Sequence, residues 1–70
     1  MADVQTRFGD KLRALRTDRG MSQEDLAAAA GLHRTYVSSV ERGERNVTIT
    51  TIEKLAKALK VSMGDLMPGG

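Results

Sequence analysis

The side chains with the clearest binding chemistry lie in one stretch, GLHRTYVSSVERGERN, at residues 31–46. Leu32, Val37 and Val40 are spaced so that their apolar side chains share one face of a short helix. Guanidinium, hydroxyl and imidazole groups occupy the positions between and beside them. If the apolar face is buried, the opposite face presents groups that can form hydrogen bonds with nucleic-acid bases and phosphates. The chemistry of this stretch therefore depends on the elements that hold its apolar face.

Apolar residues follow a helical spacing along the whole chain, and aromatic residues make up only 3% of it. The pattern predicts an all-α fold with five helices. Gly20, Gly31 and Gly43 follow the first three helices, where a C-terminal glycine is common. The predicted helices span residues 4–18, 23–30, 34–42, 49–59 and 63–67.

Four of the helix starts carry a hydrophobic staple, in which the residue before the N-cap packs against the fourth residue after it. Two of them also have Ser-x-x-Asp, a variant of the capping box, at Ser22 and Ser62. The staple pairs are Met21 with Leu26, Leu32 with Val37, Val47 with Ile52 and Val61 with Leu66. These local signals support the predicted helix boundaries.

Length and composition exclude several classes of protein. Seventy residues are expected to form one small domain, residues 1–70, near the size at which a single core is barely sufficient. The chain has no cysteine, so a disulfide framework and a Cys-ligated zinc site are both excluded. No apolar run reaches membrane-spanning length and the N-terminus lacks the core of a signal peptide, which predicts a cytoplasmic protein without membrane contact. A net charge of +2 is too small by itself to indicate nucleic-acid binding.

An enzyme and a metalloprotein are not expected. His33 lies near Ser38 and Ser39, but no acidic residue is placed to orient the imidazole for catalysis. A chain of this length leaves no room for a substrate cleft. His33 is also the only histidine and has no neighbouring ligand, so neither a metal nor another cofactor is predicted.

The second and third predicted helices are joined by a very short turn. Counting from Gln23 as the first residue, a small residue falls at the fifth position (Ala27) and glycine at the ninth (Gly31). Ala27 allows the helices to cross closely, and Gly31 permits a positive φ in the tight turn. Val37 and Val40, at the fifteenth and eighteenth positions, close the angle between the helices. This spacing is typical of a helix-turn-helix, in which the second helix enters the DNA major groove.

The stretch MSQEDLAAAAGLHRTYVSSVERGERNVTITTIEKLAKALKVSMGDL resembles the Cro and phage-repressor type of helix-turn-helix, also called the XRE type. The resemblance extends back through GDKLRALRTDRG, and HRTYVSSVERGERNVTI is especially similar to the controller proteins of restriction–modification systems. It implies a five-helix, lambda-repressor-like domain whose helix-turn-helix covers about residues 23–42. The implied function is a homodimeric bacterial or phage transcription regulator, associated with the nucleoid, that binds a palindromic operator at its own promoter. An antitoxin or another protein-interaction module of the same fold remains the alternative.

Base contacts are expected from the start of the third helix. The forked donors of Arg34 match guanine O6 and N7, a contact worth about 1–3 kcal/mol of discrimination, although a solvated surface arginine is the alternative. Hydroxyl groups on the same exposed arc can contact either bases or phosphates. They belong to Thr35, Ser38 and Ser39.

Contacts with the DNA backbone are expected around this helix. The resemblance implies that Gln23, at the start of the second helix, touches a phosphate, although ordinary helix-start polarity is the alternative. His33 stands at the N-cap, where similar proteins more often have Ser, Thr or Asp, and can cap the helix, bind phosphate or contact a base. Tyr36 either packs in the core or places its hydroxyl at a phosphate. Further backbone candidates are Arg42, Arg45 and Asn46. Arg45 can alternatively enter the minor groove, and Asn46 can instead stabilise the following turn.

Two further expectations concern assembly. The resemblance implies a structural salt bridge between Arg16 and Glu41 that ties the first helix to the third. A twofold dimer would read a palindrome with half-sites about 34 Å apart. The candidate interface residues are Val47, Ile49, Met63, Leu66 and Met67, unless they only cover the first and fourth helices. Such a small regulator can repress by blocking RNA polymerase or activate by touching it.

Overall fold

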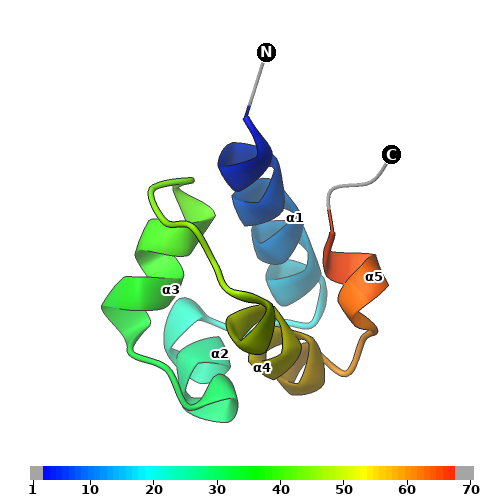
Figure 1. Cartoon of the computed structure of the whole chain (residues 1–70). Coiled ribbons are helices and arrows are strands. Elements are labelled where there is room, and N and C mark those ends of the chain that lie inside the picture. The colour runs from blue at the N-terminus through cyan, green and yellow to red at the C-terminus, as the bar shows by residue number, and fades with distance from the viewer. Residues whose placement is uncertain (1–2, 68–70) are drawn as a thin grey trace.

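The computed structural model describes residues 3–67, and these residues form five α-helices. The helices are α1 (Val4–Asp18), α2 (Gln23–Ala30), α3 (Arg34–Glu41), α4 (Ile49–Leu59) and α5 (Met63–Leu66) (Figure 1). The all-α prediction is confirmed for this part of the chain, and α3 and α5 each end one residue before the predicted position. The predicted domain, residues 1–70, also includes termini that lie outside the described residues. No helix within residues 3–67 has the length and apolarity needed to cross a membrane.

Local hydrogen bonds explain the helix boundaries. The side chains of Ser22 and Ser62 accept from the backbone N–H three residues later, and Asp25 and Asp65 return the bond to complete two capping boxes. Thr48 caps α4 in the same way, without the reciprocal bond, by accepting from the N–H of Thr51. The capping predictions are therefore confirmed.

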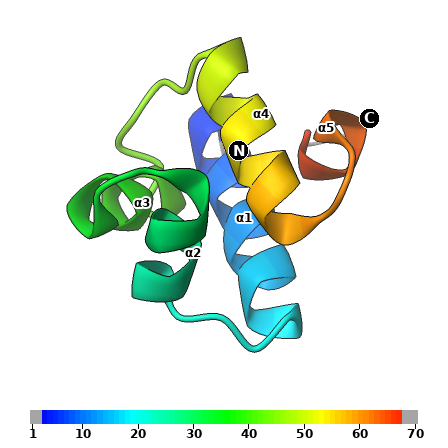
Figure 2. The same ribbon diagram turned by 90° about the horizontal axis from the view of Figure 1, so that it is seen from below.

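The helices α2 and α3 pack on one side of α1 and α4, and α5 lies on the other side (Figure 2). Leucine and valine side chains from all five helices meet in one core. The most deeply buried are Leu12, Leu26, Val37, Val40, Leu55, Leu59 and Leu66. The burial of Leu66 corrects one sequence prediction, because its side chain is 0% exposed and cannot contribute to a dimer interface in this fold. Packing of α5 against α1 and α4 removes Leu66 from the surface, which confirms for this residue the alternative that it covers the first and fourth helices.

The first helix approaches α3 very closely at Gly9. A Cβ atom added to Gly9 would lie 2.5 Å from the carbonyl oxygen of Val40 and 2.6 Å from that of Glu41. Only a residue without a side chain fits between the two backbones at this point. This contact fixes how closely α3 packs against α1, and it therefore also fixes the position of the outer face of α3.

Candidate nucleic-acid interface

The third helix has one face in the core and one face open to solvent. Val37 and Val40 on the inner face are at most 1% exposed. On the outer face Arg34 and Thr35 are exposed, and Ser38 is half-buried. With residues from the start of α2 and the end of α3, they line one shallow pocket of about 190 Å³. Its lining residues are Gln23, Arg34, Thr35, Ser38 and Arg42.

The turn between α2 and α3 has the geometry that the spacing predicts. Gly31 has a left-handed φ of 71°, and the N–H of Leu32 donates to the carbonyl of Ala27 over 2.8 Å. Ala27 itself is buried at the crossing of the two helices. The turn therefore fixes the direction in which α3 leaves α2.

His33 caps α3, as one of its three interpretations predicts. Its Nδ1 atom accepts from the backbone N–H of Thr35 over 3.2 Å and lies 2.7 Å from the hydroxyl oxygen of the same residue. The imidazole is exposed beside the pocket residue Thr35. A contact between His33 and phosphate stays a prediction.

Ser39 does not face the pocket, which corrects its prediction as a base-contacting residue. Its side chain is 8% exposed, and its hydroxyl donates to the carbonyl of Tyr36 over 2.9 Å. The same oxygen accepts from Nε of Arg45 over 3.3 Å. The guanidinium carbon of Arg45 also lies 5.5 Å from the centre of the half-buried Tyr36 ring, within cation–π range. The loop after α3 folds back over this edge of the helix, so Ser39 supports Arg45 instead of reaching solvent.

Arg42 lies at the rim of the pocket and is already engaged. Its Nη1 donates to the hydroxyl of Ser38, and its Nη2 donates to Glu44 over 3.1 Å. These bonds with Arg42 lower the pKa of Glu44. Sequence reasoning missed Glu44, whose negative charge partly offsets Arg42 at the surface where a phosphate is predicted.

A buried ion pair ties α1 to α3, which confirms the predicted salt bridge. Nε and Nη2 of Arg16 donate to the carboxylate of Glu41 over 2.6 and 3.0 Å, and the Glu41 side chain is fully buried. Burial raises the pKa of Glu41, but the hydrogen bonds from Arg16 and Gln23 and the positive charges of Arg16 and Arg13 together more than offset this, so the pKa is lowered overall.

Gln23 is held by the same carboxylate. Its Nε2 donates to Glu41 over 3.1 Å, a bond between distant residues that no sequence pattern indicates. Because Gln23 also lines the shallow pocket, the buried pair orients a side chain at the start of α2.

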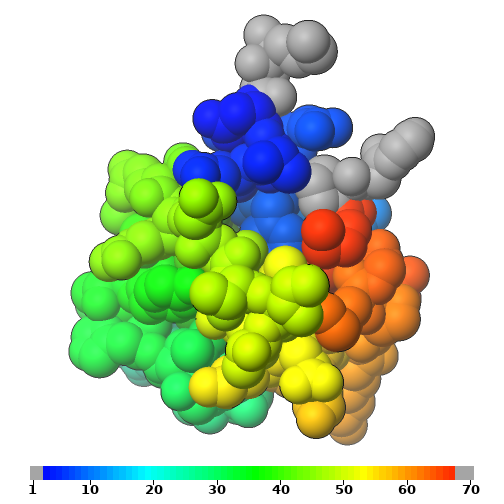
Figure 3. Space-filling view, in the orientation of Figure 1, coloured from blue at the N-terminus to red at the C-terminus, as the bar shows by residue number. Residues whose placement is uncertain are grey.

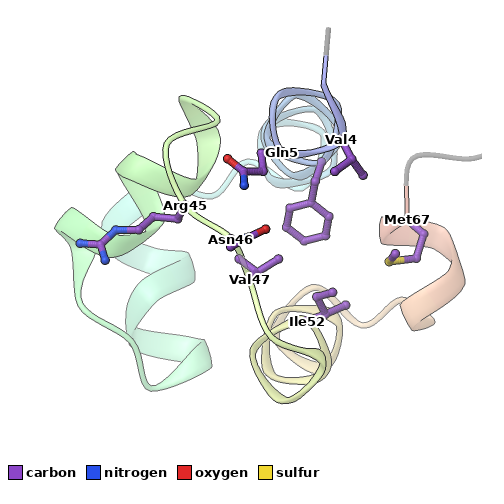
Figure 4. A pocket seen from close by; sticks show the side chains of 8 residues that line it. Val4, Gln5, Arg45, Asn46, Val47, Ile52 and Met67 are labelled. Atoms are coloured by element: carbon purple, nitrogen blue, oxygen red, sulfur yellow. The ribbon is translucent and has the colours of Figure 1, made fainter.

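A second surface, which is apolar, is formed by the start of α1, the start of α4 and the end of α5. Val4, Ile49 and Met67 are 53%, 73% and 44% exposed. Figure 3 shows these three segments, coloured blue, yellow and red, together on one face of the molecule. Beside them is a pocket of about 110 Å³ (Figure 4). Its lining residues are Val4, Gln5, Phe8, Arg45, Asn46, Val47, Ile52 and Met67.

Three residues predicted for other roles, Arg45, Asn46 and Val47, line the apolar pocket. Asn46 lines it and lies apart from the α3 pocket, whereas the Arg45 side chain extends away from it toward α3 (Figure 4). Val47 and Met63, predicted for a dimer interface, are only partly exposed and pack against the core. Sequence reasoning missed Val4, because one valine near a chain terminus carries no periodic signal.

Comparison with known proteins defines the class to which this arrangement belongs. A family model described as "Helix-turn-helix" matches residues 12–66. The chain therefore belongs to the helix-turn-helix family, whose members similar to this chain are transcription regulators.

The similar proteins include several controllers of restriction–modification systems. Control protein C.BamHI from Bacillus amyloliquefaciens is 48% identical over 66 residues, which cover 93% of this chain and 82% of that protein. The crystal structure of the controller C.AhdI from Aeromonas hydrophila has 51% identity and a TM-score of 0.89, covering 90% of this chain and 96% of that one. C.Esp1396I, crystallised as a tetramer with its natural 35-base-pair operator, has 39% identity and a TM-score of 0.82, covering 89% of this chain and 82% of that one.

Proposed function

We propose that this protein is a sequence-specific DNA-binding transcription regulator that controls a restriction–modification system. It binds a palindromic operator at its own promoter as a homodimer. The observation that carries this proposal is the outer face of α3, where Arg34 and Thr35 are exposed and Ser38 is half-buried, opposite a buried valine face. The similarity to controller proteins, one of them crystallised on its operator, supports the same function.

In this proposal the outer face of α3 enters the major groove. Arg34, in the first turn of α3, pairs with guanine O6 and N7 through its forked donors. Thr35 and Ser38 share its pocket and contact the neighbouring base pairs. Ser39 has no place among these contacts because its hydroxyl is engaged within the fold.

Groups around the pocket bind the DNA backbone. Gln23 presents its amide at the N-terminus of α2, where the free N–H groups and the helix dipole favour an anion. His33 and Arg42 flank the outer face of α3. Arg45 keeps its terminal nitrogens for a phosphate or for the minor groove while Ser39 holds its Nε. Tyr36 and Asn46 complete the predicted set, with Tyr36 acting mainly as the platform beneath Arg45.

The apolar surface around Val4, Ile49 and Met67 is proposed to pair with a second copy of the chain. One recognition helix reads only a few base pairs, and a twofold pair reads both halves of a palindrome. Large apolar side chains exposed together are typical of an interaction surface. Val47 and Met63 contribute at its margin. Regulation then follows in the cytoplasm from operator occupancy, by blocking RNA polymerase or touching it from an adjacent site.

Selection of bound sequences from random duplex DNA tests this function. The wild-type chain is expected to enrich an inverted repeat that contains a guanine in each half-site. Arg34→Ala is expected to reduce the preference for that guanine by about fivefold or more, because a bidentate contact contributes about 1–3 kcal/mol of discrimination. Lys54→Ala, at an exposed position of α4, is the matched control and retains the full preference. Failure of the wild-type chain to enrich any sequence would overturn the proposal.

A further inference from the structure

We propose that His33 fixes the hydrogen-bond polarity of Thr35, so that the threonine hydroxyl acts as an acceptor and selects a base with an exposed amino group. The inference rests on the proposed function, because it concerns the base that α3 reads. It assigns a specificity-determining role to His33 without any contact between His33 and a base.

The donor and acceptor in the two contacts between His33 and Thr35 can be assigned from the backbone N–H of Thr35. The backbone N–H of Thr35 can only donate, and it donates to Nδ1 of His33 over 3.2 Å. The Nδ1 atom therefore carries a lone pair and no proton, and the neutral imidazole holds its proton on Nε2. The hydroxyl oxygen of Thr35 lies 2.7 Å from the same Nδ1, which is hydrogen-bond distance. Since Nδ1 has no proton to give, the proton in this second contact is the one on the threonine hydroxyl.

The hydrogen bond to His33 changes what the Thr35 hydroxyl can offer to a base. A free hydroxyl can rotate and either donate or accept, so it discriminates poorly between bases. With its proton directed to His33, the Thr35 oxygen offers only lone pairs to the pocket that it lines with Arg34 and Ser38. In the major groove, adenine N6 and cytosine N4 present donors, whereas guanine and thymine present acceptors. The base facing Thr35 is therefore adenine or cytosine.

The neighbouring hydroxyl provides an internal contrast. Ser38 accepts from Nη1 of Arg42, which leaves the proton of its hydroxyl available for an outside acceptor. Thr35 and Ser38 thus present opposite hydrogen-bond polarity on one helix face, one set by a histidine and the other by an arginine. An aliphatic N-cap at position 33 would leave the polarity of Thr35 undefined.

The test measures base preference for three single variants of the full chain and for the double variant that combines His33→Ala with Thr35→Val. Operators selected by the wild-type chain are changed one base pair at a time, and competition binding gives the relative affinity for each base. Thr35→Val keeps the β-branched shape and removes the hydroxyl. His33→Ala removes the acceptor, and His33→Asn retains an oxygen that can cap the helix and accept from the hydroxyl.

The wild-type chain is expected to prefer adenine or cytosine by about threefold to tenfold at one base pair of each half-site, the range for a single hydrogen bond. Thr35→Val and His33→Ala each reduce that preference to about twofold or less, while the guanine preference due to Arg34 is retained. The double variant shows no further loss beyond Thr35→Val, because His33 acts only through Thr35. His33→Asn keeps the preference.

Three results would overturn the inference. One is a Thr35-dependent preference for guanine or thymine, and another is no effect of Thr35→Val at any base pair. The third is a uniform loss of affinity in His33→Ala across all sequences, which is the result expected if His33 only caps α3 or binds phosphate. Each leaves the proposed function standing, since the operator is still selected. Failure of the wild-type chain to select any operator would remove the proposed function and this inference together.

Discussion

The single carboxylate of Glu41 joins three helices. It sits on the inner face of α3 and receives hydrogen bonds from Arg16 of α1 and Gln23 of α2. The outer face of the same helix carries Arg34. The geometry of the proposed base contacts therefore depends on a charge that DNA never touches.

Acid is expected to weaken the fold through Glu41. The pKa of Glu41 is lower in the folded chain than its ordinary value of 4.5, so its stabilising contribution is full above about pH 4.5 and is lost as pH falls through the folded pKa. Glu41→Gln is expected to lower the free energy of unfolding at pH 7 by about 3 kcal/mol, because it leaves Arg16 without its charged partner. It should also flatten the dependence of stability on pH below 4.5. Urea unfolding between pH 7 and pH 3 measures both effects, and Glu53→Gln, at an exposed position, is the control. Identical pH profiles for wild type and Glu41→Gln would contradict this assignment.

Ser39 is expected to influence DNA affinity only through Arg45. Ser39→Ala removes the hydroxyl that holds Nε of Arg45, so this long side chain must be ordered during binding, at a cost of about 0.5–1.5 kcal/mol. The affinity for the selected operator should fall by about twofold to tenfold. A double-mutant cycle with Arg45→Ala checks the coupling, with urea unfolding to correct for stability. If Ser39→Ala has the same effect with and without Arg45, the two residues act independently.

The residues on the face of α3 could be predicted because the helix period and the buried valines define its outer arc. Thr35 and Ser38 follow from that pattern, and so does Arg34. Ser39 and Leu66 were not placed correctly, because their burial comes from tertiary contacts. A loop covers Ser39, and α5 turns Leu66 into the core. The loop contact over Ser39 has no sequence signature, whereas the staple of Val61 with Leu66 and the alternative that Leu66 covers the first and fourth helices both pointed to its burial.

Helix boundaries were predictable because their signals are local. A serine or threonine at the start and a glycine after the end act within one turn of the chain. Lys60 is the exception, since it adopts a left-handed φ of 59° after α4, at the kind of position that Gly31 fills after α2. The end of α4 was found from its apolar pattern alone. The close approach of α1 to α3 at Gly9 was not predicted, because a glycine inside a helix carries no information about its neighbour.

Two glycines within helices should respond differently to replacement by alanine. Alanine normally stabilises a helix relative to glycine by about 1 kcal/mol. At Gly64 of α5 the nearest neighbour of an added Cβ, the hydroxyl oxygen of Ser62, is 3.7 Å away, so Gly64→Ala should be neutral or slightly stabilising. At Gly9 the added Cβ would meet the backbone of α3 at 2.5 Å, and Gly9→Ala should destabilise the fold by about 1–3 kcal/mol. Urea denaturation of the two variants provides the comparison. A stabilising Gly9→Ala would show that α1 can move away from α3 at little cost.

The loop after α3 connects the two candidate surfaces of the molecule, the outer face of α3 and the apolar surface. Arg45 extends toward α3, and two residues later Val47 lines the apolar pocket (Figure 4). A second copy on the apolar surface would therefore lie next to the segment that carries a proposed DNA contact. Dimerisation would fix the spacing of the two recognition helices and limit the freedom of this loop. The sequence identified the helices and two of the apolar side chains outside the core, Ile49 and Met67, but it did not identify Val4.

Ile49→Asp is expected to separate the proposed dimer without unfolding the chain. Ile49 is 73% exposed, so its replacement removes little from the core, and an acidic residue is favourable at the first position of α4. Placing a charge in an apolar interface leaves it desolvated and unpaired, which weakens association strongly. Sedimentation velocity should show a monomer for Ile49→Asp and a dimer for the wild-type chain. Thr50→Asp introduces the same charge at the next exposed position and should remain dimeric.

Because a monomeric Ile49→Asp would bind each half-site independently, it should also lose the dependence of affinity on the spacing of the palindrome. A dimeric Ile49→Asp that still requires the palindrome would place the twofold contact on a different surface of the molecule.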